Sequence, residues 1–230
     1  MADKYTKEQK KELIKKLDLQ IKACEKCGLC KTATQAVPGA GYYDADIMFI
    51  GEAPGFYEDR DGLPFVGRAG KLLDFLLHQI NLKRENIYIT NIVKHRPPEN
   101  RDPTEEEILA CQPFLKKQVE IIEPKVIATL GRYAMNYFLP NAKISTSHGV
   151  EVVMPNYVLY PLYHPAAALR NGAVKKDLIL DFLRLPEIVE KVKKGEFENL
   201  NKENGDNESQ PILKDDNLQE KDKPKQIKLI

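Results

Sequence analysis

The chain has 230 residues, of which 42% are hydrophobic and 30% are charged, and its formal net charge is +1. This length and composition predict one large domain or two small ones with a sizeable core. No run of 18 apolar residues suggests a membrane span, and the polar N-terminus predicts no secretory signal. We therefore expect a monomeric, cytoplasmic protein whose four cysteines do not form structural disulfides.

The charges are distributed unevenly. Residues 196–230 carry 6 Lys and 9 acidic residues, whereas the rest of the chain carries 29 basic and 25 acidic residues. The first part is thus mildly basic, which permits a polyanionic partner without identifying one. The polar composition of residues 196–230 predicts a disordered C-terminal tail. Its last residues, 225–230, are compatible with a docking peptide for a sliding clamp, although we favour a merely solubilising tail.

Hydrophobic periodicity in residues 1–195 predicts helices and strands in alternation. Helices are expected over 6–22, around Leu72 to Ile80, after the capping-box pair Thr104 and Glu107, after Gly131, and over about 174–194. Strands are expected over 46–50, 87–90, 125–130 and 157–162, with an extra strand over 149–154. This order predicts a single α/β domain over residues 1–195: a three-layer α/β/α sandwich around a mostly parallel four-stranded sheet.

Two motifs follow expected strands directly. Gly51-Glu52-Ala53-Pro54-Gly55 comes after the strand at 46–50, and the segment from His164 to Arg170 comes after the strand at 157–162. The carboxyl ends of parallel strands meet at one edge of a sheet, where ligands bind. We therefore expect Glu52 and His164 to face one pocket, which favours an enzyme.

The cysteines suggest a metal site. Cys24 and Cys27 are separated by two residues, a spacing that lets both thiolates bind one centre. A redox dithiol is disfavoured because the pair follows an expected helix instead of opening one after a strand. Further ligands would come from Cys30, His95 and Cys111. Taken alone, Cys111 is more simply explained as a small buried hydrophobe, and His95 as a solvated loop residue.

From Cys24 to about Arg170 the chain resembles the family 4 uracil-DNA glycosylases, the iron–sulfur branch of that superfamily. The motifs that carry the resemblance are Cys24-x2-Cys27, Gly51 to Gly55, Glu58-Asp59, Gly62 to Gly70, Ile89 to Lys94, Arg96-Pro97-Pro98-x-Asn100-Arg101 and His164 to Arg170. The resemblance implies a uracil-DNA glycosylase-like fold and an enzyme that flips uracil out of DNA, single- or double-stranded, and hydrolyses its N-glycosidic bond. This reaction starts base excision repair of deaminated cytosine.

The resemblance also implies a 4Fe–4S cluster held by four cysteines. Three of these positions match Cys24, Cys27 and Cys111, and the fourth falls on His95. X-type relatives also have a histidine at this position and still carry the cluster, and imidazole binds iron in Rieske centres. We therefore predict a Cys3His ligand set, with Cys30 as the alternative fourth ligand. The expected role of the cluster is structural.

Roles for the substrate-site residues follow from the same resemblance. Phe65 would stack on uracil and Asn91 would bind its polar edge, while Ala53 and Gly55 line the substrate site. Ala53 stands where many uracil-DNA glycosylases have an aspartate. Charge stabilisation at the sugar, or positioning of the water, therefore falls to Glu52, with Glu58 in reserve. His164 would donate a hydrogen bond to the developing uracil oxyanion. Glu52 could equally act indirectly, by orienting backbone amides.

On the DNA side, Leu169 is the predicted wedge that fills the gap left by the flipped base. Phosphate contacts are predicted for the following basic residues: Arg170, Arg68, Lys94, Arg96 and Arg101. X-type relatives trap their product covalently through a histidine in an insertion before the last ligand cysteine. No histidine lies between His95 and Cys111, so we expect ordinary turnover.

Two alternatives remain at this point. One is a non-catalytic iron–sulfur module that binds nucleic acid, and the other is an X-type glycosylase that traps its product. A nucleotide-binding loop at Gly51 to Gly55 is disfavoured because the segment lacks the glycine spacing and the Lys-Ser/Thr pair of a P-loop.

Overall fold

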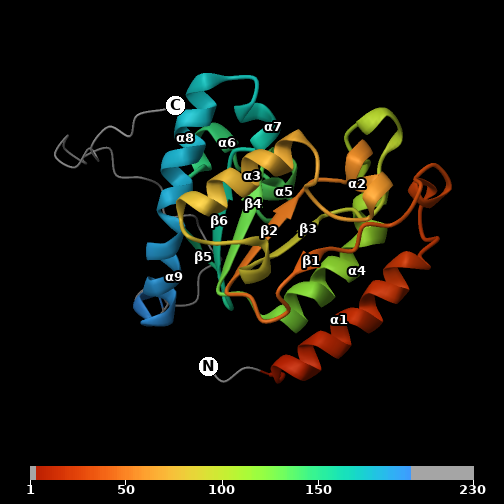
Figure 1. Ribbon diagram of the computed structural model, residues 1–230, viewed down its shortest axis with the longest axis horizontal. Helices are drawn as coiled ribbons and strands as arrows, with labels where there is room; N and C mark the ends of the chain where they lie inside the picture. Colours follow the sequence, from red (N-terminus) through yellow and green to blue (C-terminus); the bar gives the residue numbers. More distant parts are fainter. Residues whose placement is uncertain (1–3, 198–230) are drawn as a thin grey trace.

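The centre of the fold is a mixed six-stranded sheet (Figure 1). The computed structural model describes residues 4–197. The strands are β1 (Ala40–Gly41), β2 (Ile47–Gly51), β3 (Tyr88–Asn91), β4 (Val126–Leu130), β5 (Val152–Val153) and β6 (Val158–Leu162). They lie in the order β1-β3-β2-β4-β6-β5. The four central strands are parallel, and both edge strands are antiparallel to their neighbours.

The four expected strands are the four central strands of this sheet, and the expected extra strand is β5. The edge strand β1 was not predicted, because two residues are too few to produce a hydrophobic pattern. In the parallel register of β2 and β3, Gly51 pairs with Asn91. This pairing brings the first motif and the Asn91 side chain to the same edge of the sheet.

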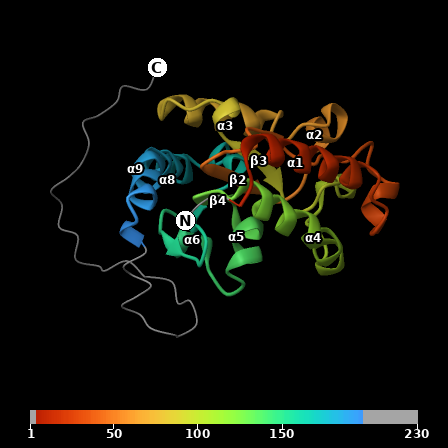
Figure 2. The same ribbon diagram turned by 90° about the horizontal axis from the view of Figure 1, so that it is seen from below.

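Helices cover both faces of the sheet, which confirms the predicted three-layer arrangement. The α-helices are α1 (Lys7–Lys22), α2 (Phe56–Asp61), α3 (Arg68–Gln79), α4 (Glu105–Ile122), α5 (Arg132–Phe138), α6 (Ile144–Ser147), α7 (Pro165–Ala168), α8 (Gly172–Leu183) and α9 (Leu185–Lys193). Three short 3-10 helices are η1 (Gly28–Lys31), η2 (Arg84–Asn86) and η3 (Pro98–Asn100). Figure 2 shows α3 on one side of the strands and α4 and α5 on the other.

Each face has its own hydrophobic core. Apolar residues of α3, α8 and α9 pack with Phe49, Ala128 and Tyr160 on one face. Apolar residues of α1, α4 and α5 pack with Met48 and Ile127 on the other. Successive residues of β2 and β4 thus point to opposite cores, as the period of a strand requires. A strand that is buried on both faces has the continuous apolar sequence seen in β2 and β4.

Capping boxes start the two long helices of the second face. The Thr6 side chain accepts from the Gln9 backbone N–H in α1, and Thr104 makes the equivalent bond with Glu107 in α4. The predicted start of α4 is therefore confirmed. The two helices pack against each other. Cys24 follows α1 and Cys111 lies within α4, so this packing brings both cysteines to one end of the helix pair.

The last predicted helix, 174–194, is divided in two. The chain turns at Arg184, which ends α8 and starts α9, and Pro186 lies in the first turn of α9. Proline has no N–H to donate to the preceding turn, so it favours a new helix over continuation. Among residues 4–197 we find no helix that is long and apolar enough to cross a membrane. The expectations of disorder and clamp docking concern residues that lie mainly outside the described part of the chain.

Gly70 lies in the first turn of α3, where the loop at Phe65 crosses the helix. A Cβ atom at Gly70 would lie 1.6 Å from the Phe65 carbonyl oxygen. We expect Gly70→Ala to lower the free energy of unfolding by about 2 kcal/mol, because backbone must move to admit the methyl group. Urea denaturation followed by circular dichroism measures the change. Gly172→Ala is the matched control, since no atom lies within 4 Å of its added Cβ. Equal stability of Gly70→Ala and the wild type would contradict this account.

Candidate active site

A cavity of about 380 Å³ lies beyond the carboxyl ends of the central strands. It is lined by Glu52, Ala53, Pro54, Gly55, Glu58, Phe65, Ala69, Asn91, Pro97, Asn100, Arg101, Asp102, His164, Ala166 and Arg170. The structure thus brings together every predicted catalytic and substrate-site residue, along with Arg101 and Arg170. Arg68 and Leu169 are not among the lining residues, and both are exposed.

Because Gly51 has no side chain, the Asn91 amide and the Phe65 ring can approach it closely and form the cavity wall. A Cβ atom there would lie 2.4 Å from Asn91 Oδ1 and 2.6 Å from the Phe65 ring. Asn91 Oδ1 is buried and has no hydrogen-bond partner among the described residues. A buried acceptor without a partner is costly, so this atom is suited to accept from a bound ligand. The amide and the neighbouring ring together fit a flat ligand with an N–H group on its edge.

Phe65 is fixed in an uncommon backbone conformation, with φ at 54°. Arg84 Nη1 donates to the Pro64 carbonyl at 2.9 Å, and Nη2 donates to the Phe65 carbonyl. A bulky residue at positive φ is strained and persists only where its surroundings hold it. The side chain is 6% exposed. The ring is therefore a rigid wall of the cavity.

Glu58 connects two loops of the site. Its Oε1 accepts from the Val66 and Gly67 amides at 2.8 and 2.9 Å, and its Oε2 accepts from the Gly55 amide at 3.1 Å. The carboxylate thus ties the first motif to the loop that carries Phe65. Three backbone donors occupy the oxygens that a catalytic role would need to be free. The structure therefore favours a positioning role for Glu58 over the predicted role as reserve catalyst.

His164 lies at the N-cap of α7 and is held in one tautomer. Its Nδ1 accepts from the Ala166 amide at 3.0 Å, which leaves the proton on Nε2. Burial lowers the pKa of His164 to about 4, so the ring is neutral near pH 7. The ring centroid lies 5.8 Å from that of Phe65. Gly131 has a φ of 92° and leaves space for His164, because a Cβ there would lie 2.9 Å from the histidine Cβ. The site therefore contains a fixed neutral imidazole with one N–H to donate.

Glu52 is the acid whose ionisation the site changes most clearly. Burial, and then the nearby Asp102 carboxylate, raise its pKa to about 7, while Arg132 opposes the shift. Asp102 is itself anchored, because the Tyr133 hydroxyl donates to it, and Arg132 Nη2 donates to the same hydroxyl at 2.8 Å. The sequence did not single out Asp102. No motif marks it, and only the fold brings it near Glu52.

The loop that carries Asp102 is also constrained. Glu99 and Asn100 have φ values of 55° and 56°. Arg101 donates to both carboxylate oxygens of Glu107 at 2.9 and 2.7 Å. Consecutive left-handed residues with side chains are strained, and such strain is concentrated at functional sites. The Arg101–Glu107 pair anchors this loop to the first turn of α4.

Lys94 corrects one expectation. It was predicted to contact phosphates, but the residue is 1% exposed. Its ammonium donates to Thr90 Oγ1 at 2.6 Å, to the Asn91 carbonyl at 2.7 Å and to Gln118 Oε1 at 2.7 Å. These bonds use all three N–H groups. Lys94 therefore supports the backbone of Asn91 from inside the protein and cannot reach DNA.

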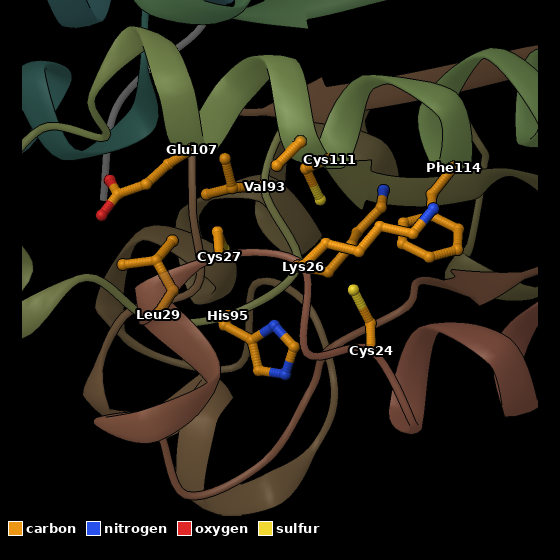
Figure 3. A pocket seen from close by; sticks show the side chains of 11 residues that line it. Cys24, Lys26, Cys27, Leu29, Val93, His95, Glu107, Cys111 and Phe114 are labelled. Atoms are coloured by element: carbon orange, nitrogen blue, oxygen red, sulfur yellow. The ribbon is translucent and has the colours of Figure 1, made fainter.

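A second pocket contains the residues predicted to bind the cluster. Cys24, Cys27, His95 and Cys111 all line this one small pocket. Figure 3 shows the Cys24 and Cys111 thiols turned toward one another, with Cys27 and His95 beside them. His95 is buried, contrary to the simple view of a solvated loop residue. Cys30 is not among the lining residues, and its thiol donates to the Cys27 carbonyl at 3.2 Å.

Thiols and an imidazole, the donor types in this pocket, are ones that bind soft and borderline metals. Burial raises the pKa of Cys27 and of Cys111, so their thiolate forms need a compensating positive charge. Burial lowers the pKa of His95, which favours the neutral imidazole that binds metals. Within the part of the chain that is described, no three acidic, His or Cys side chains are close enough to hold a single metal ion.

Sequence comparison identifies the family. The family model of the uracil DNA glycosylase superfamily matches residues 38–184. The chain is 45% identical over 185 residues to the type-4 uracil-DNA glycosylase of Sulfurisphaera tokodaii, covering 76% of this chain and 84% of that protein. The chain belongs to the type-4 uracil-DNA glycosylases. Identity to the Saccharolobus solfataricus enzyme is 48% over 178 residues, or 73% of this chain and 82% of the relative. Identity to the Archaeoglobus fulgidus enzyme is 44% over 178 residues, which cover 74% of this chain and 89% of the relative.

The electrostatic effect of Asp102 on Glu52 can be tested directly. Asp102→Asn removes a negative charge that raises the pKa of Glu52, so we expect that pKa to fall from about 7. Carboxyl carbon chemical shifts followed by NMR across pH measure the titration. Burial remains in the variant, so the pKa should stay above the ordinary range of glutamate. Glu99→Gln, in the same loop, is the matched control. An unchanged Glu52 titration in Asp102→Asn would contradict the proximity.

Proposed function

We propose that this protein is a monofunctional DNA glycosylase that flips uracil out of DNA and hydrolyses its N-glycosidic bond. This reaction starts base excision repair of deaminated cytosine. Membership of the type-4 family supports the activity. The observation that carries the proposal is the unpaired buried acceptor of Asn91 beside the Phe65 ring, with Glu52 and His164 lining the same cavity.

Uracil recognition is assigned to Asn91 and Phe65. The N3–H of uracil donates to Asn91 Oδ1, and the Asn91 amide N–H donates to O4. The base stacks against the ring of Phe65. Cytosine presents an acceptor at N3 and a donor at the exocyclic position, so both contacts would be lost and the amide left unpaired. Rejection of an analogue by an unpaired buried group is a strong source of specificity.

Bond cleavage divides charge between base and sugar. The bond between N1 and C1′ breaks, its electron pair stays on uracil, and C1′ gains positive charge. His164 Nε2–H donates to the uracil oxyanion, and the neutral ring needs no proton from solvent. Ionised Glu52 stabilises the positive sugar and accepts a proton as water adds to C1′. Ala53 and Gly55 form the cavity wall next to Glu52.

DNA contacts are proposed at the rim of this cavity. Leu169 is 42% exposed, as a side chain that enters the base stack must be. Arg170 lines the cavity, and Arg68 is exposed at the start of α3. These two cations would bind phosphates on either side of the extruded nucleotide, whereas Arg101, although it lines the cavity, is held by Glu107 and positions the loop.

We also propose that Cys24, Cys27, His95 and Cys111 hold a 4Fe–4S cluster. Three thiols and an imidazole around one space support this ligand set, and the position of Cys30 outside that lining disfavours it as a ligand. When bound, the cluster supplies a fourfold crosslink and not chemistry at the base. The ligands come from the turn after α1, the loop after β3 and α4, so they join three segments.

Two other activities are less well supported. A non-catalytic binding module would not need the combination of an acid and a fixed imidazole in one cavity. A product trap of the X-type would need a histidine between His95 and Cys111, and that segment contains none.

The catalytic roles predict a pH profile. Glu52 must be ionised, and its pKa is about 7, so single-turnover uracil release should rise about tenfold from pH 6 to pH 8. His164 remains neutral between pH 6 and pH 8, so its titration does not change the rate in this range. Glu52→Gln should lower the rate at pH 8 about 100-fold or more and abolish the rise. His164→Ala should lower it about 100- to 1000-fold.

The measurement is uracil release from a labelled oligonucleotide with enzyme in excess. His78→Ala is the matched control for His164, because His78 is exposed on α3. Denaturing electrophoresis of the same reactions checks for a covalent adduct. A Glu52→Gln enzyme with the wild-type profile would refute the role of Glu52, and a stable adduct would refute ordinary turnover.

The ligand set predicts iron content. Cys24→Ser, Cys111→Ser and His95→Ala should each lose most bound iron, whereas Cys30→Ser should retain it. His95→Cys should retain iron because it restores a thiolate. Iron analysis and visible absorption of anaerobically purified protein measure the outcome. Iron loss in Cys30→Ser together with retention in His95→Ala would reverse the assignment of the fourth ligand.

A further inference from the structure

Two large aromatic side chains lie exposed beside the cavity. Phe56 is 55% exposed and Tyr57 is 48% exposed. They are the first two residues of α2 and directly follow Gly55, which lines the cavity. Their ring centroids are 5.4 Å apart, and the rings are nearly perpendicular, at 84°. Contiguous exposed apolar side chains mark interaction surfaces on many proteins, so we ask what this pair could bind.

A cation links Phe56 to the cavity rim. The guanidinium of Arg96 lies over the Phe56 ring, 5.2 Å from its centroid. Arg96 Nε also donates to Asn100 Oδ1 at 2.8 Å, and Asn100 lines the cavity. This partner is a neutral amide, so it does not neutralise the positive charge. The corresponding cation over Tyr57, Arg60, is paired with Asp61 at 2.6 Å. Phe56 is thus the ring with the more available charge.

The position of this surface matches the path of a DNA strand. We call Phe56, Tyr57 and Arg96 the aromatic platform. The cavity lies between α2, which carries the platform, and α7, which is followed by Leu169 and Arg170. Figure 1 shows both helices at the end of the sheet toward which β2 points. A strand that places one nucleotide in the cavity must continue past its rim, and one direction leads over the platform.

We propose that Phe56, backed by Arg96, stacks an unpaired base adjacent to the flipped nucleotide and so strengthens binding to single-stranded DNA. This inference rests on the proposed function. Every base has a π-face, so stacking on an aromatic ring is tolerant of sequence, and arginine adds a contact to the neighbouring phosphate. In a duplex the adjacent base is already stacked and paired. The platform therefore increases the affinity for duplex DNA less than the affinity for single-stranded DNA.

The first experiment measures affinity. The probe is a fluorescent single-stranded oligonucleotide with thymine in place of uracil, followed by anisotropy at fixed salt. Phe56→Ala should weaken binding about tenfold, and Phe56→Leu should weaken it nearly as much. Phe56→Tyr, which keeps an aromatic ring, should bind as tightly as the wild type. Binding to the matching duplex should change less than about twofold. Phe75→Ala is the matched control, since Phe75 is 45% exposed on α3. Circular dichroism verifies the fold of each variant.

The second experiment locates the base. The adenine analogue 2-aminopurine, placed one nucleotide to either side of the target, loses fluorescence when it stacks. Wild-type protein should quench one of the two positions in single strands, and Phe56→Ala should abolish that quenching. Equal single-strand affinity and equal quenching in wild type and Phe56→Ala would overturn the proposal, and would indicate that the aromatic pair serves another partner.

Uracil release from duplex DNA separates this proposal from the proposed function. If the wild-type protein releases uracil but Phe56→Ala binds single-stranded DNA as tightly as wild type, the stacking role of Phe56 is wrong and the proposed glycosylase activity stands. Absence of release by the iron-loaded wild type, with single-strand binding that still depends on Phe56, would support the platform and overturn the proposed function.

Discussion

The site depends on the absence of a side chain at Gly51. Parallel pairing of Gly51 with Asn91 ends β2 and β3 at the same level, and the space a Cβ would occupy is taken by the Asn91 amide and the Phe65 ring. The ring can enter because its loop is held in a strained conformation by Arg84 and by the amides that Glu58 binds. The close approach of these groups leaves an amide oxygen buried and unpaired, ready for a ligand.

Burial shifts the pKa values of the two catalytic candidates, Glu52 and His164, in opposite directions. Burial disfavours charge, so it raises the pKa of Glu52 and lowers that of His164. The imidazole is thereby kept neutral, which suits a hydrogen-bond donor to a developing oxyanion. The acid is left near its midpoint at neutral pH, where it can exist as a base. Asp102 adds to the effect on Glu52, and the Tyr133 hydroxyl holds Asp102 in place.

One segment joins the cysteine pocket to the cavity. His95 lines the pocket, and residues only a few positions later line the cavity, from Pro97 to Asp102. Lys94 reaches inward between them and donates to the carbonyl of Asn91. A cluster in the pocket would thus anchor the base of a loop whose outer part forms the cavity wall. A group bound in the pocket would therefore help to hold the cavity wall in place.

The sequence alone determined the central strands, both capped helices and the two motif loops, because these depend on local periodicity and on the rule that parallel strands end together. It also indicated the cysteine positions. Only the tertiary structure decided that Lys94 is buried, that Glu58 is occupied by three amides, that Asp102 lies near Glu52 and that Cys30 lies outside the lining of the pocket. These properties depend on burial and on contacts between residues that are distant in the sequence. A local sequence pattern does not specify which distant groups come close together in the fold.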